Sequence, residues 1–366
     1  MYMRIMYLLF SFTVGGTERL IVNICNQMKA NGEEVFLLIV NNLIDDKLLN
    51  TLDKRINIKL LKRKVGSNNK VSPLMQVAEY ISKNKIEVVH CNSFNAPELL
   101  VLSKMINPRC KIVSTIHGVG QFQKVGKFEI ALKNWICNQF IGISDAVKRD
   151  IVQAGIKESK VQRIYNGIDV TKYECAQKKL FDVDHVVIGC IARIMPLLKG
   201  QDVLLRAINK LKKKFPRIMV MFAGGVAEEQ KNEYKELQEY VKNNDLSTNV
   251  TFLGSVDDIP AFLNTIDICV VPSRSEGFGL ALVEALSMGV PCVASNIEGP
   301  KEILRNERGG TMFNNGDSVD LATKIEEIIL NYNVVKKLTW NDKEAIKERY
   351  SIQSMCIKLM EVYETH

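Results

Sequence analysis

The sequence predicts an α/β protein built from two doubly wound units in series. Apolar, β-branched strand-like runs alternate with helical segments along the chain, which indicates parallel sheets with helices on both faces. With 366 residues, the chain exceeds the length of one ordinary hydrophobic core. The turn residues Asn166-Gly167-Ile168-Asp169, followed by a polar stretch at 172–184, place the linker between the units.

The first unit contains strand-like runs that are mostly separated by helical segments. Strands are expected at 3–10, 34–40, 86–90, 111–116, 139–143 and 161–164. Helices are expected at 17–30, 72–83, 94–105 and 144–153. The apolar start of the chain, Ile5–Val14, runs into Gly15-Gly16-Thr17-Glu18 without a small-residue cleavage site, so we interpret it as a core strand rather than a signal peptide.

The same alternation restarts after the linker. Strands are expected at 186–192, 218–223, 249–253, 267–271 and 291–294. The helices between them are expected at 200–213, 228–243 and 279–288. From residue 295 onward the pattern is helical, with segments at 318–330, 333–340 and 343–363.

Cysteine usage and charge limit the classes of protein to consider. The nine cysteines are scattered, odd in number and form no Cys-x-x-Cys pair, which fits a reducing, cytoplasmic compartment better than a disulfide framework or a zinc site. No apolar run reaches the length of a membrane span. Residues 1–170 carry 24 Lys and Arg against 14 Asp and Glu, whereas residues 171–366 carry 25 against 27.

The basic first half, with its net charge of +10, has two interpretations. It can face an anionic membrane surface or an acidic acceptor, or the charge can simply be solvated. The clusters that would make such contacts are Lys54-Arg55, Lys62-Arg63-Lys64, and Lys124, Lys127 and Lys133 around Phe128 and Trp135.

The most informative stretch is Ser275–Ala294. Glu276 and Glu284 lie eight positions apart around a glycine-rich turn and a short helix that is otherwise almost wholly apolar. A carboxylate on such a buried helix is costly to desolvate unless hydrogen-bond donors meet it, and sugar hydroxyls would serve. Gly277 and Gly279 allow backbone N–H groups to approach a ligand at the helix N-terminus, where an anion is favoured.

This stretch resembles the Glu-x7-Glu signature of retaining glycosyltransferases of family 4, which have the GT-B fold of two Rossmann-like domains facing a central cleft. The resemblance implies that Glu276 contacts the donor sugar and Glu284 the ribose of the nucleotide. It also implies nucleotide contacts from the intervening turn, Gly277, Phe278, Gly279 and Leu280.

A second loop carries two cations. The run Ala192–Asp202 follows the first strand of the second unit and resembles the family's Arg…Lys-Gly loop, which holds the donor diphosphate. That resemblance makes Arg193 and Lys199 the candidates for stabilising the negative charge on a departing diphosphate, which fixed cations can do without a metal.

The first unit supplies further candidates. Gly15 and Gly16 join the first strand to the first helix and match the position of the family's Gly-Gly loop, near the donor phosphate and acceptor. His117 ends a predicted strand, where ligands bind in open α/β sheets, and the resemblance places an active-site histidine there. His90 ends the preceding strand and is a weaker candidate for the acceptor site.

Two features depart from the expected patterns. Where many members have Gly-Gly-x-Pro-Glu, this chain reads Asn296-Ile297-Glu298-Gly299-Pro300-Lys301-Glu302, which leaves the donor sugar open. Asp182-Val183-Asp184 matches the metal motif of another glycosyltransferase fold, but it lies in the linker, so we treat it as a chance match and expect no metal site.

Together these features predict a retaining, metal-independent hexosyl- or N-acetylhexosaminyltransferase that uses a nucleoside diphosphate-sugar, with UDP-sugar favoured, as co-substrate and no cofactor. The acceptor would be a glycan or lipid-linked envelope intermediate, at or near the inner membrane face. The expected domains are 1–170 for the acceptor, 171–349 for the nucleotide-sugar, and a helix at 350–366 packing back on the first domain. The alternatives are a nucleotide-sugar epimerase, a phosphorylase or a non-catalytic scaffold; a dehydrogenase lacks its Gly-x-Gly-x-x-Gly fingerprint.

Overall fold

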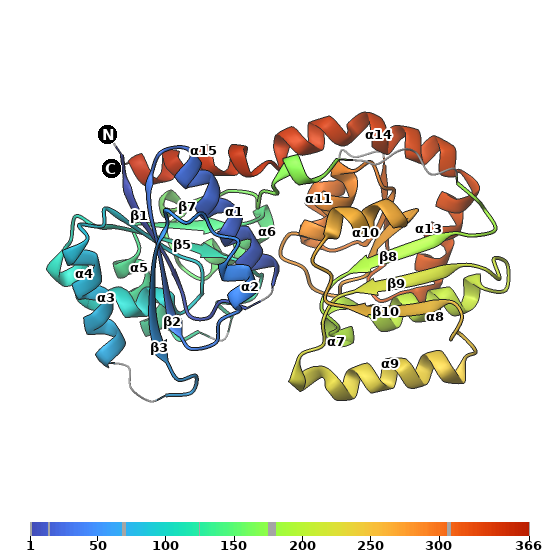
Figure 1. Ribbon diagram of the computed structural model, residues 1–366, viewed down its shortest axis with the longest axis horizontal. Coiled ribbons are helices and arrows are strands. Elements are labelled where there is room, and N and C mark those ends of the chain that lie inside the picture. Colours follow the sequence, from blue (N-terminus) through green and yellow to red (C-terminus); the bar gives the residue numbers. More distant parts are fainter. Residues whose placement is uncertain are drawn as a thin grey trace. The chain divides into compact units, whose positions relative to one another are not determined.

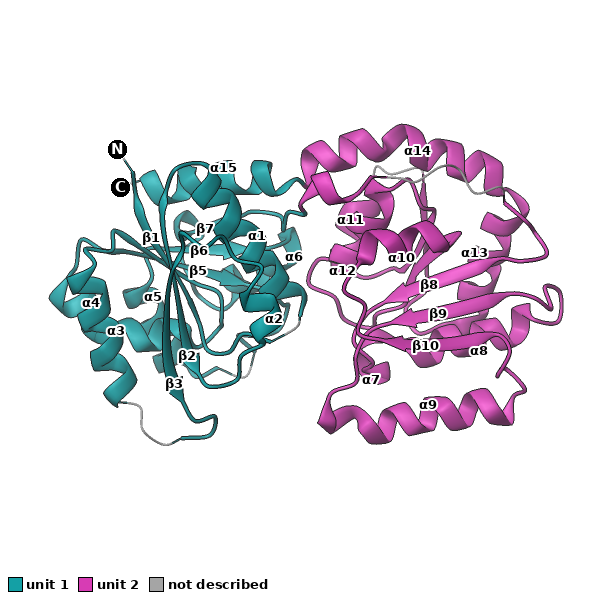
Figure 2. Ribbon diagram, viewed as in Figure 1, with its two compact units in different colours: residues 1–168, 351–366 teal, residues 169–350 magenta. Residues whose placement is uncertain are grey.

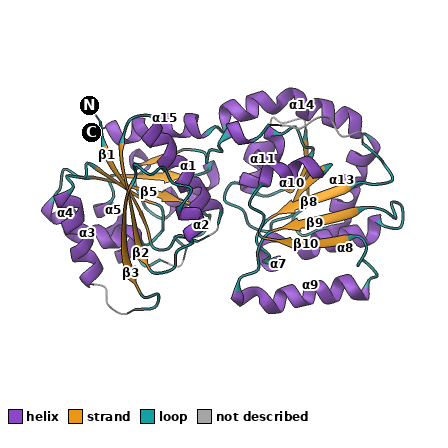
Figure 3. Ribbon diagram, viewed as in Figure 1, coloured by secondary structure: helices purple, strands orange, loops and turns teal. Residues whose placement is uncertain are grey.

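The computed structural model describes residues 2–13, 15–67, 71–123, 125–174, 181–305 and 309–365. The chain forms two compact units, Met1–Ile168 with Ser351–His366, and Asp169–Tyr350 (Figure 2). Both units are parallel sheets with helices packed on them, as the alternation of apolar runs predicts (Figure 3).

The first unit is a seven-stranded parallel sheet in the order β3-β2-β1-β4-β5-β6-β7 (Figure 1). Its strands are β1 (Arg4–Leu9), β2 (Glu34–Asn41), β3 (Asn57–Arg63), β4 (Val88–Cys91), β5 (Lys111–Ile116), β6 (Gln139–Gly142) and β7 (Val161–Arg163). Its helices are α1 (Gly16–Ala30), α2 (Asp46–Leu49), α3 (Val71–Lys83), α4 (Val101–Ile106), α5 (Lys127–Ile136), α6 (Asp145–Gln153) and α15 (Ile352–Glu364), with the 3₁₀ turns η1 (Ala96–Leu100) and η2 (Glu158–Lys160). Apolar residues of α1 and α15 share one buried cluster with the central strands.

The second unit is a six-stranded parallel sheet in the order β10-β9-β8-β11-β12-β13. Its strands are β8 (Val187–Ile191), β9 (Met219–Ala223), β10 (Val250–Gly254), β11 (Ile268–Val271), β12 (Cys292–Ser295) and β13 (Gly310–Phe313). Its helices are α7 (Pro196–Lys199), α8 (Gln201–Leu211), α9 (Lys231–Asn243), α10 (Ile259–Thr265), α11 (Leu280–Ser287), α12 (Glu298–Leu304), α13 (Ser318–Leu330) and α14 (Tyr332–Arg349), with η3 (Val170–Lys172) and η4 (Glu228–Gln230). Helices α8, α9 and α13 cover one face and share its apolar core.

Two strands escaped the sequence analysis because they lie at sheet edges. In β3 the side chains are mostly exposed, and the strand carries Lys59, Lys62 and Arg63, as charged edge strands do. The four-residue β13 pairs with β12 at the edge of the sheet and is too short to give a periodic signal. Both strands lack the continuous apolar run that marks a buried central strand.

The helices near the C-terminus differ from the prediction of a break near residue 341. A single helix, α14, runs through that point, since Asn341 and Asp342 interrupt neither its backbone nor its register. The actual break is at Tyr350-Ser351, where Ser351 Oγ caps α15 by accepting from Ser354 N at 3.0 Å. There the chain also bridges to Ile168 before α15 packs against α1.

The predicted helix at 94–105 begins as the 3₁₀ turn η1 and continues as α4. Pro97 lies within the 3₁₀ turn, where its missing N–H costs no helical hydrogen bond. The segment is therefore helical, but its first turn is tighter than predicted.

The cysteine thiols that the structure describes lie in the interior of the two units. The eight cysteines within the described residues are all buried free thiols, and Cys175 lies outside those residues. Burial raises the pKa of Cys110, Cys137 and Cys356 to about 12. Within the same described ranges, every helix is too short or too polar to cross a bilayer.

Candidate functional site

The second unit places its candidate residues at one edge of the sheet. Strands β8 and β11 are neighbours at the centre, and the strand order reverses between them. The loops that follow them, 192–200 and 272–279, therefore leave the same carboxyl edge at the topological switch point, where open α/β sheets bind ligands. Arg193 and Lys199 lie on the first loop, and Glu276 lies on the second.

Lys199 and Glu276 meet across these two loops. Lys199 Nζ donates to Glu276 Oε2 at 2.6 Å, and each of the two side chains is 21% exposed to solvent. Ser273 Oγ also donates to the same carboxylate oxygen, at 3.3 Å. A cation and a carboxylate, 77 positions apart in sequence, are thus joined at one half-buried point.

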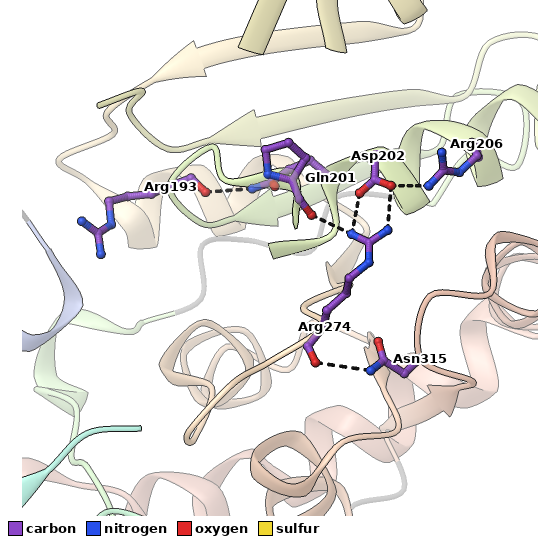
Figure 4. A network of polar contacts seen from close by, with 7 residues as sticks. Arg193, Gln201, Asp202, Arg206, Arg274 and Asn315 are labelled. Atoms are coloured by element: carbon purple, nitrogen blue, oxygen red, sulfur yellow. Dashed lines mark hydrogen bonds and ion pairs between the residues drawn. The ribbon is translucent and has the colours of Figure 1, made fainter. Parts of the chain in front are cut away.

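The Arg193 side chain is differently placed. Its carbonyl accepts from Gln201 Nε2 at 2.8 Å, which fixes the backbone of the loop. Its guanidinium is exposed, has no hydrogen bond or ion pair within the described chain, and points away from the neighbouring polar network (Figure 4). The structure therefore holds the backbone of Arg193 at the edge and leaves its charge available.

Glu284 has a protein donor on the apolar helix α11. Tyr173 Oη donates to Glu284 Oε1 at 2.7 Å. Gly279 caps the start of this helix with φ of 112°, a left-handed conformation that glycine tolerates best. The expected desolvation cost is thus partly offset by a tyrosine, a partner that the sequence pattern did not indicate.

Phe278 and Leu280 differ from the site residues around them. The Phe278 ring is 1% exposed and packs edge-to-face on Tyr350, with ring centroids 5.6 Å apart. Its side chain is part of the core, so only its backbone can contribute to a ligand site. Leu280 is the first residue of α11 and is partly buried.

Gly299 supports the Glu276 loop, a role that sequence analysis did not assign. A Cβ at Gly299 would lie 2.6 Å from Glu276 O and 2.8 Å from Phe278 N. The close approach of α12 to this loop therefore requires glycine. The signal available in the sequence was that Gly299 is the one glycine kept in the divergent Asn296–Glu302 segment.

Asp202, in the first turn of α8, and Arg274, on the second loop, form another ion pair, which sequence analysis missed. Arg274 Nη1 donates to Asp202 Oδ1, and Nη2 donates to Oδ2, both at 2.7 Å (Figure 4). Arg206 also bonds to Asp202. Burial acts to raise the pKa of Asp202, but the hydrogen bonds and charge of Arg274 outweigh burial and lower that pKa. The available signal was position: Asp202 lies three residues after Lys199, and Arg274 lies two before Glu276.

In the first unit, the candidate glycines lie at the corresponding reversal, between β1 and β4, and the candidate histidine lies one strand farther along the sheet. Gly15 and Gly16 follow β1, with Gly15 extended at the N-cap of α1. His117 follows β5, the neighbour of β4. The Nε2 atom of His117 is buried without a hydrogen-bond partner among the described residues, and burial lowers its pKa to about 4. His117 is therefore a neutral imidazole at pH 7, with one ring nitrogen unpaired.

His90 is a structural residue in this unit. Its Nδ1 pairs with Tyr363 Oη at 2.5 Å and its Nε2 with Thr115 Oγ1 at 2.6 Å, and the side chain is fully buried. Burial, with a smaller contribution from His117, lowers its pKa to about 3. Both ring nitrogens are used to hold α15 and β5, which leaves none for an acceptor.

The basic cluster around α5 is only partly a surface feature. Lys133 is 1% exposed; its Nζ lies 3.0 Å from Glu98, 3.3 Å from Glu129 and 3.0 Å from Phe94 O. The expectation that Lys133 faces a membrane is therefore wrong, because its charge is neutralised inside the unit. Lys124 lies outside the described residues, whereas Phe128 and Trp135 are 83% and 51% exposed.

In the Asp-x-Asp motif, the Asp182 carboxylate is hydrogen-bonded within its own turn. Asp182 Oδ1 accepts from Asp184 N at 2.9 Å, and Asp182 Oδ2 lies 2.7 Å from His185 Nδ1. Across the described ranges, no group of three or more His, Cys, Asp and Glu side chains is arranged to hold a metal ion.

Comparisons with known proteins match both units. Residues 14–172 match the family model described as Glycosyltransferase Family 4, and residues 172–345 match Glycosyl transferases group 1. The capsular polysaccharide biosynthesis glycosyltransferase CapM of Staphylococcus aureus is 23% identical over 340 residues, 88% of each chain. The O-antigen biosynthesis glycosyltransferase WclY of Escherichia coli is 27% identical over 81% of this chain and 80% of its own.

A solved structure shares the whole fold. The crystal structure of Anabaena HepE in complex with UDP has a TM-score of 0.84 and 21% identity, and the match covers 98% of this chain and 99% of HepE. The two parallel Rossmann-like sheets and the two family matches confirm the predicted family and fold. The chain therefore belongs to the glycosyltransferases of family 4 and group 1, which have the GT-B fold.

Proposed function

We propose that this glycosyltransferase moves a sugar, with retention of anomeric configuration, from a nucleoside diphosphate-sugar to a hydroxyl acceptor. The observation that carries the proposal is the ion pair of Lys199 and Glu276 at the switch point of the second unit. Support for UDP as the nucleotide comes from HepE, which has been solved with UDP and with UDP-glucose.

Each candidate residue receives a role in this proposal. Arg193 and Lys199 stabilise the diphosphate, with backbone N–H groups of the Gly277–Leu280 turn adding donors at the start of α11. Glu276 accepts from hydroxyls of the sugar and Glu284 from those of the ribose. Gly15, Gly16 and His117 lie in the first unit and serve the phosphate, the acceptor and the transferred sugar.

In the proposed step, the acceptor oxygen forms a bond to the anomeric carbon while the bond from that carbon to the diphosphate oxygen breaks. The electron pair leaves with the diphosphate, and a phosphate oxygen takes the acceptor proton. Attack occurs on the face from which the diphosphate leaves, so no protein nucleophile is assigned. The charge that develops on the leaving group lies beside Arg193 and Lys199, and this is where the protein lowers the barrier.

For the acceptor, we propose a glycan or lipid-linked intermediate of the cell envelope, handled at the cytoplasmic face of the membrane. CapM and WclY are named for capsule and O-antigen biosynthesis. The exposed Phe128 and Trp135 are seven residues apart on α5, two turns along one helix face, and form an apolar contact for a lipid surface.

The membrane contact is tested with vesicles of phosphatidylcholine with and without phosphatidylglycerol. We expect sedimentation with the anionic vesicles, and weaker sedimentation when Phe128→Ser and Trp135→Ser are combined. Leu330→Ser, at an exposed apolar residue of α13, is the matched control. Equal sedimentation of all three proteins would contradict the contact through α5.

The donor and reaction are tested in two steps. Thermal unfolding is first measured with UDP, GDP and ADP, since a ligand at ~100 times its dissociation constant adds about 2.7 kcal/mol of stability. The sugar nucleotides of the base that binds are then incubated with acceptors, and the anomer of the product is determined by NMR. An inverted product would overturn retention, and turnover of donor without any acceptor would favour an epimerase or hydrolase instead.

A further inference from the structure

Arg274 connects the loop of Glu276 to the loop of Lys199. Besides its two bonds to Asp202, Nη1 of Arg274 donates to Pro196 O at 2.6 Å (Figure 4). Pro196 is the first residue of α7, the single turn that ends at Lys199. Asp202 lies in the first turn of α8, directly after that turn. The guanidinium of Arg274 therefore binds the chain on both sides of Lys199.

Backbone contacts join the loops at the same place. Arg274 N donates to Leu198 O at 2.8 Å, one residue before Lys199. Gly200, with φ of 69°, lies so close to Pro272 that a Cβ would be 1.9 Å from Pro272 O. On its other side, the carbonyl of Arg274 accepts from Asn315 Nδ2 at 3.3 Å, so the second loop is itself held in place.

From these contacts we propose that Arg274, paired with Asp202, is a positioning residue that brings Lys199 and Glu276 together before a donor binds. The inference rests on the proposed function, because it assigns the purpose of the pair to the donor site. Lys199 has a long flexible side chain, and its ammonium can reach a fixed point only if the backbone of α7 is fixed. Arg274 fixes that backbone relative to Glu276, which is two residues away along its own loop.

Arg274 is placed to position other groups rather than to contact the diphosphate itself. Three of the five N–H donors of its guanidinium are committed to Asp202 and Pro196, and the Asp202 carboxylate neutralises its charge. The exposed Arg193 guanidinium, in contrast, has no such partner within the described residues. Arg274 thus holds the two loops together, whereas the charge of Arg193 remains available for a ligand.

A test without any ligand measures how well Lys199 is held. The protein is treated with an amine-reactive reagent, and the labelling rate of Lys199 is followed by mass spectrometry, with the exposed Lys235 as internal reference. We expect Arg274→Ala to label several-fold faster at Lys199 and unchanged at Lys235. Arg206→Ala is the matched control, because it removes the other cation on Asp202 but none of the bonds that Arg274 makes. Equal labelling of Lys199 in the native protein and in Arg274→Ala would overturn the proposal.

A second test asks whether Arg274 acts through Lys199. Misplacement of a reacting group by about 1 Å can slow a reaction by ~10²-fold, so we expect Arg274→Ala to lower kcat by a factor of this order. In a Lys199→Ala background the same substitution should have little further effect, because the group it positions is gone. Independent, multiplicative effects of the two substitutions would overturn the positioning role.

Two controls keep these outcomes interpretable. Asp202→Asn retains the size of the side chain and removes the charge that Arg274 pairs with; it should reproduce the faster labelling of Lys199 and the loss of kcat even if Arg274→Ala does not fold. A native protein that neither binds UDP, GDP or ADP nor transfers sugar would overturn the proposed function, while the labelling experiment would still decide whether Arg274 holds Lys199.

Discussion

The protein contains two lysine–glutamate clusters that differ in how many protein groups surround the ammonium. Lys133 on α5 in the first unit is 1% exposed, and its ammonium reaches Glu98, Glu129 and the carbonyl of Phe94. It also lies 4.5 Å from the centre of the Phe94 ring. Two of the three N–H donors of its ammonium are committed to Glu98 and the Phe94 carbonyl, and Glu129 lies at ion-pair distance.

Lys199 in the second unit is left unsaturated by comparison. Its described protein partner is Glu276, and the pair lies at the carboxyl edge of the sheet with 21% of each side chain exposed. Donors and charge remain for a ligand there. The difference teaches that the number of protein partners and the position at the switch point distinguish a cation that can serve a ligand from a structural one, because residue type and the presence of a nearby glutamate do not.

The largest effect is expected at the second cluster. Lys199→Ala and Arg193→Ala should each raise the transfer barrier by about 2–4 kcal/mol, or roughly 30- to 1,000-fold in rate, because each removes a cation beside the leaving diphosphate. Steady-state kinetics measures this, and the melting temperature should change little, since both groups lie at the edge of the unit. Lys235→Ala, on the exposed face of α9, is the control. Near-normal turnover in both variants would mean that the Lys199 cluster, like the Lys133 cluster, does not act on the diphosphate.

The first cluster should show the opposite pattern. Lys133→Met removes hydrogen bonds to charged groups inside the unit, and we expect the free energy of unfolding to fall by about 2–3 kcal/mol. Chemical denaturation measures the loss. Nucleotide binding by the second unit should be unchanged at temperatures where the variant is folded. A stable Lys133→Met variant would show that the buried cluster contributes specificity rather than stability.

Gly299→Ala tests whether packing behind the site matters as much as charge within it. The added methyl would press on the backbone at Glu276 and Phe278, and overpacking of this kind costs about 1–3 kcal/mol. We expect lower thermal stability together with weaker nucleotide binding, since the strained segment carries Glu276. Gly126→Ala, at a glycine where an added Cβ would meet nothing within 4 Å, should change neither property.

Sequence patterns indicated which segments of the second unit meet, but not how far individual side chains are buried. The resemblance to the family's motifs singled out Lys199 and Glu276, and two parallel strands that end side by side bring the segments that carry them together. The sequence did not predict which side chains would have all their hydrogen-bonding groups paired within the protein. Lys133 and His90 look like exposed or functional residues in the sequence, and only the fold reveals the partners that bury them.

The supporting residues were harder to predict for a related reason. Arg274, Tyr173 and Gly299 act through contacts with segments that are distant in sequence: Asp202, Glu284 and the Glu276 loop. Their residue types are common in loops and helices, and their neighbours give no periodic signal. Such contacts depend on how loops pack at the sheet edge, which local sequence preferences do not determine.

The buried histidines of the first unit give it a distinct pH dependence. The pKa values of His117 and His90 fall to about 4 and about 3, below the ordinary value near 6.5, so the unfolded chain binds more protons than the folded one between pH 6.5 and 4. The contribution of these neutral histidines to the free energy of unfolding is fully present above pH 6.5 and is lost as the pH falls below that value. Each histidine contributes a slope of about 1.4 kcal/mol per pH unit.

Replacing one of these histidines should therefore flatten the pH profile. We expect His117→Gln to reduce the slope of unfolding free energy between pH 6 and 5 by about 1.4 kcal/mol per pH unit, measured by denaturant titration. His185→Gln, at an exposed histidine, is the control. An unchanged slope would mean that His117 is protonated in the folded protein at these pH values and is not the neutral group described above.

The smallest effect is expected from chelation, and it bears directly on what the exposed cations do. If Arg193 and Lys199 supply the positive charge for the leaving diphosphate, transfer should survive EDTA with little change in rate. The combined substitution Asp182→Asn and Asp184→Asn should be equally silent, because the Asp182 carboxylate is held in its own turn by Asp184 N and His185 Nδ1. Loss of transfer with EDTA, restored by Mg²⁺ or Mn²⁺, would mean that the second unit's cations are incomplete without a metal. Lys199 would then serve mainly as a partner for the Glu276 carboxylate and not for a phosphate. In that respect it would resemble Lys133, although Lys199 is more exposed.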